Sequence, residues 1–335
     1  MPSLPRSAEQ YGRDQRTEIR AALAALRRRW RRMGDDFDAS WARLEPGILT
    51  VLDTAQERVA SGAVEYIPAV LAETGQLVRP PSYQVDPWRL VGTSGDGWGT
   101  DSLAYGAVIR AKEAIGAGAS IAQALHRGGT YLTTATGTML SDTRRTAERM
   151  AGASRGVTLW VRMLEPPSCG RCIQLAGKET RNPVAFQRHP RCDCRNIPTT
   201  ENLAGSMVTD PREYLDGLSD RELARALGSQ SNARAYRDGA DHNQLINAYR
   251  HKGDVRSAQV YGQNVKYTTE GVTRRGQAYR AMRRAGYAQG QTDVRAKGAR
   301  YFRAKAPRLM PESIYQIATD PADARRLLRL YGWTG

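Results

Sequence analysis

This sequence has few cysteines and no long apolar run. Its 335 residues include four cysteines, all between Pro166 and Pro198, so disulfides cannot hold the whole chain together. No stretch reaches the roughly 18 uninterrupted apolar residues of a membrane span, and the N-terminal stretch lacks the apolar core of a secretion signal. We therefore expect a soluble protein made in the cytoplasm, where thiolates are favoured over disulfides.

Acidic residues are also scarce. The chain has 34 Asp and Glu against 50 Lys and Arg, which gives a formal net charge of +16. This balance favours a polyanionic partner, either a nucleic acid or an acidic protein surface. Composition does not choose between these two partners.

Residues 274–308 are strongly basic, and tyrosine and phenylalanine lie between the cations. Mixed cations and aromatic rings suit contact with a nucleic-acid backbone, although docking on an acidic protein would need a similar surface. The candidate residues for nucleic-acid or partner binding are Arg274, Arg275, Arg280, Arg283, Arg284, Arg300 and Arg303.

Apolar periodicity predicts mainly helical structure in the first half of the chain. Spacings of three and four predict an amphipathic helix over residues 17–33, whose arginine-rich outer face suits DNA, an acidic partner or solvent. A second helix is predicted over residues 37–73, with an early turn at Pro46 and a kink or break at Pro68. Together these helices would form a hairpin.

The central region continues this helical pattern after an irregular connection. Residues 75–100 predict a long loop with a short ordered patch around Trp88. Helices are predicted over residues 101–117 and 120–153, with Ser120 and Ser141 as N-caps.

The periodicity then changes from helical to extended. Residues 156–164 alternate in the manner of a strand that leads into the cysteine segment. We expect a mainly α protein with four parts: a hairpin (1–75), a linker and central helices (76–155), a small β/zinc knuckle (156–205), and a basic, partly helical C-terminal region (206–335).

The cysteine segment has the spacing of a zinc site. Cys169-x-x-Cys172 is followed, after sixteen residues, by His189-x-x-Cys192-x-Cys194. A C-x-x-C turn lets two thiolates converge on one tetrahedral ion, and the later donors can close the site. Five donors compete for four positions, and the spacing does not show whether His189 or one of the cysteines is left over.

A filled tetrahedral site has no position for a reacting water, so the predicted zinc is structural. Buried thiols, two disulfides or a catalytic cysteine are the weaker alternatives for this cluster. We find no serine-nucleophile elbow, phosphate-binding loop or protease triad, and therefore predict no enzymatic activity. A metal-dependent nuclease using His242 and Asn243 is a third hypothesis, although no second histidine or carboxylate lies at metal-binding spacing.

The cysteine motif resembles a known family. A strand leading into "CGRC", then "LAGK" and "HPRCDCRNIP", is similar to the zinc-binding end of the phage head morphogenesis domain, found in minor capsid proteins related to protein F of phage Mu (MuF-like proteins). The motif residues are Cys169, Cys172, Gly177, His189, Pro190, Cys192 and Cys194. The resemblance covers roughly residues 100–200. Phrases near the C-terminus, such as "RDGADHNQLINAYR", also resemble extensions of such proteins in tailed phages of actinobacteria.

The resemblance implies a minor capsid protein that associates with the portal, the major capsid protein or both. It would be assembled in the host cytoplasm and lie inside the capsid or at the portal vertex, acting in head assembly, genome packaging or ejection. It implies neither a membrane partner nor a small-molecule substrate. The basic charge suits contact with encapsidated double-stranded DNA. A zinc-stabilised DNA-binding protein that works outside the particle is the alternative.

Overall fold

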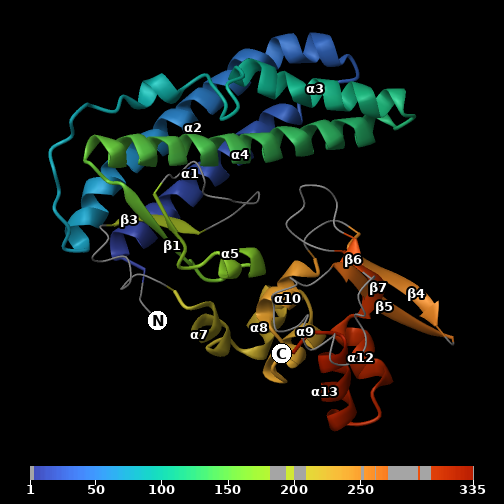
Figure 1. The fold of residues 1–335 in the computed structure, drawn as a ribbon. Helices are drawn as coiled ribbons and strands as arrows, with labels where there is room; N and C mark the ends of the chain where they lie inside the picture. Colours follow the sequence, from blue (N-terminus) through green and yellow to red (C-terminus); the bar gives the residue numbers. More distant parts are fainter. Residues whose placement is uncertain are drawn as a thin grey trace. The chain divides into compact units, whose positions relative to one another are not determined.

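The protein is represented by a computed structural model. The structure describes residues 4–181, 194–199, 209–249, 253–260, 262–270, 293–294 and 303–334. They fall into two compact units, one within Met1–Glu165 and Ala176–Thr209 and the other within Pro166–Leu175 and Asp210–Gly335. Each unit is described by itself (Figure 1).

The first unit is built on four long helices. These are α1 (Arg6–Trp30), α2 (Phe37–Glu73), α3 (Thr100–Gly116) and α4 (Ile121–Ser154). Figure 1 shows them packed along one another, with α2 and α4 in contact with all of the others. The connection between α2 and α3 contains one short 3₁₀ helix, η1 (Pro87–Leu90), as predicted around Trp88.

Helix α1 begins well before the predicted start. Its first residues follow no simple apolar stripe, but the carboxylate of Glu73 accepts the backbone N–H groups of Arg6 at 2.6 Å and Ser7 at 2.7 Å. A residue at the far end of α2 thus caps α1, because the first N–H groups of a helix have no partner within it. Local sequence could not show this contact.

The turn predicted at Pro46 and the N-cap predicted at Ser141 are wrong, and the helix does not break at Pro68, where a kink stays a prediction. Helix α2 continues through Pro46 and Pro68, and α4 continues through Ser141, whose hydroxyl donates to the carbonyl of Gly137 at 2.8 Å. Pro46 is exposed, so the carbonyl that loses its N–H partner can bond to water instead. By contrast, the predicted cap at Ser120 is confirmed, since its side chain forms a capping box with Gln123.

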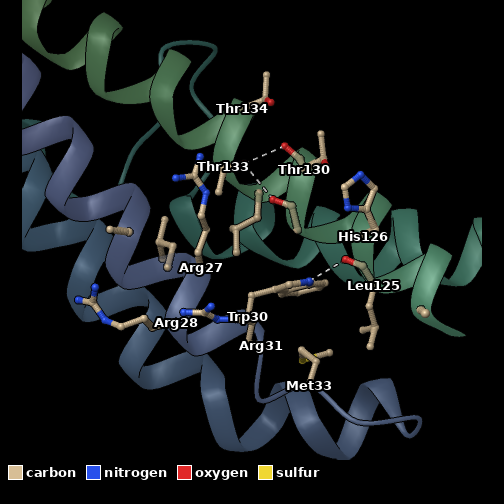
Figure 2. A pocket seen from close by; sticks show the side chains of 15 residues that line it. Arg27, Arg28, Trp30, Arg31, Met33, Leu125, His126, Thr130, Thr133 and Thr134 are labelled. Atoms are coloured by element: carbon tan, nitrogen blue, oxygen red, sulfur yellow. Dashed lines mark hydrogen bonds between the residues drawn. The ribbon is translucent and has the colours of Figure 1, made fainter.

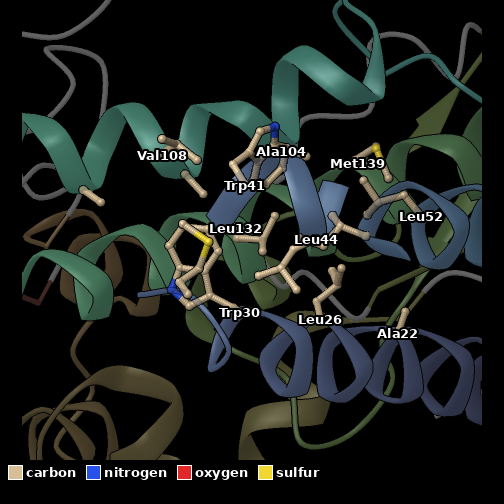
Figure 3. Close-up of a cluster of buried hydrophobic side chains, with 14 of the residues drawn as sticks. Ala22, Leu26, Trp30, Trp41, Leu44, Leu52, Ala104, Val108, Leu132 and Met139 are labelled. Atoms are coloured by element: carbon tan, nitrogen blue, oxygen red, sulfur yellow. The ribbon is translucent and has the colours of Figure 1, made fainter. Parts of the chain in front are cut away.

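The core of this helical bundle is a continuous apolar cluster. Leu26 of α1, Ile48 and Leu52 of α2, and Leu132 of α4 are fully buried in it. Figure 3 shows Leu26 and Leu132 with Leu44 near Trp30 and Trp41, and Leu52 beside Met139. Each such side chain contributes about 1.5–3 kcal/mol through burial. The apolar residues that recur every three or four positions are therefore the ones through which the helices pack against one another.

A small antiparallel sheet belongs to the same unit. Its order is β2 (Glu179–Thr180), β1 (Leu159–Met163), β3 (Arg195–Thr199). The predicted strand over residues 156–164 is confirmed by β1. All residues of β1 and β3 are buried, and Trp160, Val161 and Ile197 join a second apolar cluster with α1 and α2.

The second unit combines short helices with another antiparallel sheet. Its helices are α5 (Gly170–Gln174), α7 (Pro211–Asp216), α8 (Asp220–Leu227), α9 (Gln230–Arg237), α10 (His242–Asn247), α12 (Pro311–Ile317) and α13 (Pro321–Leu330). Its strands, in sheet order, are β4 (Val255–Val260), β5 (Gln263–Glu270), β7 (Arg303–Leu309) and β6 (Asp293–Val294).

The fold is thus mainly helical with small antiparallel sheets, but the sequence analysis missed the sheet of the second unit. We expected a basic, partly helical C-terminal region. Strands β4 and β5 form a hairpin in which Val260 pairs with Gln263, and Gly262 in the connection has a φ of +77°, which glycine adopts without strain. The sheet depends on pairing between β5 and the distant β7.

Candidate metal centre

The first two predicted ligands lie on one helical turn. Cys169 is the N-cap of α5 and Cys172 lies within it. The backbone N–H of Ile173 donates to the carbonyl of Cys169 at 3.0 Å, which closes the turn. As a result the two Sγ atoms are 3.5 Å apart, with Cys172 buried and Cys169 exposed.

The separation of the two sulfur atoms fits a shared metal ion and not a disulfide. It is far longer than the S–S bond of about 2.05 Å. Two thiolates bound at about 2.3 Å to one tetrahedral zinc lie about 3.8 Å apart. The turn would have to open by only about 0.3 Å to match that edge of the tetrahedron. Cys169 and Cys172 therefore fit half of a zinc site.

Helix α5 packs against two other helices of the second unit. A Cβ on Gly170 would lie 2.7 Å from the carbonyl oxygen of Ala226 in α8 and 2.9 Å from Ile246 in α10, so this position between the cysteines has no room for a side chain. The amide of Gln174 also donates to the carbonyl of Asn243 at 3.2 Å. The thiol pair is thus held on a packed element.

The later ligands are only partly described. Cys194 directly precedes β3 and is buried; β3 pairs with β1 so that Arg195 lies opposite Met163. His189 and Cys192 lie outside the described residues. Which donors accompany Cys169 and Cys172 therefore stays a prediction.

A buried ion pair holds the strand that follows Cys194. Nη2 of Arg195, which is 4% exposed, lies 2.5 Å from Oε2 of Glu165, and the other oxygen of this carboxylate pairs with Arg16 of α1. Burial, followed by the charge of Arg144, lowers the pKa of the Arg195 guanidinium, and Glu165 opposes this shift. Arginine nevertheless remains charged in proteins, so the pair stays ionic.

Aromatic and charged groups extend this buried network. The rings of Tyr11 and Tyr66 stack at 4.2 Å, and the hydroxyl of Tyr11 donates to Oε1 of Glu148 at 2.9 Å. Burial and then the charge of Glu148 raise the pKa of Tyr11, which keeps its proton in this hydrogen bond. Nε of Arg144 lies 3.6 Å from the same oxygen. These partners are buried, so the network supports the fold and offers no access to a substrate.

The structure does not describe the side chains of the arginines predicted to bind nucleic acid or a partner. Arg303 begins β7, of whose first residues only the backbone is described. The other six lie outside the described residues: Arg274, Arg275, Arg280, Arg283, Arg284 and Arg300.

His242 is a buried side chain at the start of α10. It is 6% exposed, its ring packs edge-on against Tyr236, and burial lowers its pKa, although Asp241 opposes the shift. In the described part of the chain, no three His, Cys, Asp or Glu side chains gather in an arrangement that could hold a metal ion. The backbone carbonyl of Asn243 accepts a hydrogen bond from the amide of Gln174, and the side chain of Asn243 has no hydrogen-bond partner among the described residues. The nuclease hypothesis thus gains no support from these contacts.

A groove that the sequence analysis did not identify lies between the C-terminal part of α1 and the first half of α4. Its volume is about 820 Å³. Figure 2 shows Arg27 and Arg28 projecting from α1, Arg31 from the C-cap that follows it, and His126 and Thr133 from α4. The run of arginines was the sequence signal for this surface. The groove itself could not be predicted, because it forms only where α1 packs beside α4.

No helix in the described residues has both the length and the apolar character of a membrane span. Comparison with protein-family models, with curated proteins and with solved structures gave no match.

Proposed function

We propose that the chain is a MuF-like minor capsid protein of a tailed phage, with a structural zinc site. The observation that carries the proposal is the geometry of Cys169 and Cys172, whose sulfur atoms are 3.5 Å apart on one helical turn. In the chain these two cysteines follow strand β1, and Cys194 directly precedes β3, which pairs with β1. The family motif has the same order.

The zinc would act as a structural cross-link. Cys169 and Cys172 would supply two thiolates, and two of His189, Cys192 and Cys194 would complete the site. A bound zinc contributes its binding free energy to folding. The stretch that joins the C-x-x-C turn to β3 would gain most, because few regular backbone hydrogen bonds are expected there.

The net charge supports a position beside packaged DNA. A chain with a formal charge of +16 is attracted to closely spaced phosphates. The protein would associate with the portal or the inner capsid surface, and its basic C-terminal arginines would contact DNA or an acidic protein face during head assembly, packaging or ejection.

Elemental analysis of reduced, chelator-free protein tests the metal site. We expect about one zinc per chain and cysteines protected from thiol reagents. Cys169→Ser or Cys172→Ser should release the metal and leave the four-helix bundle folded, as followed by circular dichroism. Retention of zinc by His189→Ala would assign the site to the four cysteines. Four reactive thiols without metal would remove the basis of the proposal.

Co-expression with a portal protein distinguishes the proposed function from its alternatives. A minor capsid protein should co-purify with portal or capsid assemblies. A zinc-stabilised DNA-binding protein would instead bind free duplex with a steep dependence on salt. Metal-dependent cleavage of DNA that is lost in Asn243→Ala would favour the nuclease.

A further inference from the structure

The groove between α1 and α4 (the α1/α4 groove) is lined by cations on an apolar floor. Arg27, Arg28 and Arg31 are exposed, as is His126, and none of the described residues that line the groove is acidic. Within the described part of the chain, the three arginines form no ion pair with a neighbouring carboxylate. Their charges are available to a partner.

Part of this charge has a purely local explanation. Basic side chains in the last turn of a helix interact favourably with the negative end of the helix dipole, and Arg27 and Arg28 lie in the last turn of α1. The dipole accounts for the sign of the charge. It does not account for a groove of about 820 Å³ beside it, a volume in the range of ligand-binding pockets.

Two polar groups of the groove floor are already bonded within the protein. The indole N–H of Trp30 donates to the carbonyl of Leu125 at 2.8 Å, and the hydroxyl of Thr133 donates to the carbonyl of Gly129 at 3.0 Å; Figure 2 shows both bonds. Leu26 and Leu132 are fully buried beneath the groove, so the apolar surface that a ligand could reach comes from the partly buried Ala24 and Leu125 and from the exposed edges of Trp30 and Met33.

Small residues along the groove allow a close approach. Ala24 of α1 and Ala122 of α4 line it, and Ala122 is exposed. Helices pack at axial separations of about 8–10 Å, depending on the size of the side chains at the contact. Arg31 is the C-cap of α1, keeps helical backbone angles and donates its N–H to the carbonyl of Arg27. The two arginines are four residues apart and so lie on one face, where they match acidic residues spaced by one turn on a partner helix.

We propose that the α1/α4 groove binds an acidic amphipathic helix of a partner protein. The apolar side of that helix would cover the floor, and its carboxylates would pair with Arg27 and Arg31. A nucleic-acid backbone is the competing ligand, but phosphates would leave the apolar floor uncovered. This inference depends only on residues of the first unit, and so it stands whether or not the zinc site is confirmed.

Fluorescence anisotropy with a designed probe tests the proposal. The probe is a stapled helical peptide of about four turns, with leucines along one face and glutamates beside them. The first control peptide has the same composition with its leucines spread around the helix, and a labelled DNA duplex is the second control. We expect the amphipathic peptide to bind at least about tenfold more tightly than its scrambled form.

Variants of exposed residues separate charge from shape. Arg27→Glu combined with Arg31→Glu should weaken binding by at least about tenfold, as should Ala122→Trp, which fills the groove without altering its charge. Arg20→Glu is the matched control, because Arg20 is exposed on the same helix and does not line the groove; it should bind normally.

Three results would overturn the proposal. The first is no binding of the amphipathic peptide, and the second is equal binding of both peptides. The third is duplex binding that depends on Arg27 and Arg31 but is unaffected by Ala122→Trp, which would identify a nucleic-acid surface instead. Circular dichroism of each variant confirms that the helices remain folded.

Discussion

Replacing Gly12 by alanine tests whether the buried pair of Arg195 and Glu165 holds β3 to helix α1. A Cβ at position 12 would lie 2.7 Å from Cζ of Arg195 and closer still to Nη2. An arginine tip could usually move aside. Here it is 4% exposed and paired with Glu165 at 2.5 Å, so moving it separates a buried ion pair.

Two opposing effects set the change in the free energy of unfolding that we expect for Gly12→Ala. Breaking a buried pair costs about 3–5 kcal/mol, and alanine in a helix gains about 1 kcal/mol over glycine. Nε of Arg195 has no hydrogen-bond partner among the described residues, so the pair is incompletely satisfied and the loss should lie near the low end. We expect Gly12→Ala to lower the free energy of unfolding by about 2–3 kcal/mol.

Urea denaturation followed by circular dichroism measures this loss. Gly116→Ala is the matched control, since a Cβ there meets no atom within 4 Å; it should be neutral or slightly stabilising. In an Arg195→Ala background the clash disappears, and Gly12→Ala should cost little. If Gly12→Ala proves as stable as the parent protein, or if its cost is unchanged without Arg195, the reasoning is wrong.

Two further predictions concern the cores of the two units. Leu52→Ala removes a fully buried side chain and should cost about 2–5 kcal/mol in urea denaturation; a loss below about 1 kcal/mol would contradict the packing. Burial lowers the pKa of His242 below its ordinary value of 6.5, so the unfolded chain binds this proton more readily. Stability of the second unit should therefore be fully present above about pH 6.5 and fall as pH drops toward the lowered pKa, and His242→Gln should flatten that dependence.

The long helices could be predicted because their signals are local. The range 37–73 predicted for α2 agrees with the structure, and Ser120 caps α4 as expected. A stripe of apolar residues and a capping side chain lie within a few turns of each other, so sequence distance and spatial distance are nearly the same. The early start of α1 escaped prediction because its cap, Glu73, comes from another helix.

The closeness of two of the predicted ligands could be predicted to the same degree, whereas the metal itself stays a prediction. The spacing of Cys169 and Cys172 placed both on one turn, and their sulfur atoms lie 3.5 Å apart. The role of Gly170 could not be foreseen, since its lack of a side chain matters only where α5 packs against α8 and α10. The choice among His189, Cys192 and Cys194 depends on contacts that spacing does not determine.

Sequence by itself determined the mainly helical class, the bounds of α2, α3 and α4 to within one residue, the excess of positive charge and the closeness of the Cys169 and Cys172 thiols. Only the tertiary structure decided that Arg195 is buried against Gly12, that β5 pairs with β7, and that α1 and α4 enclose a groove. The physical reason is that periodicity and caps act between neighbours in the chain, whereas burial, ion pairing and cavities arise between segments that meet only when the core forms.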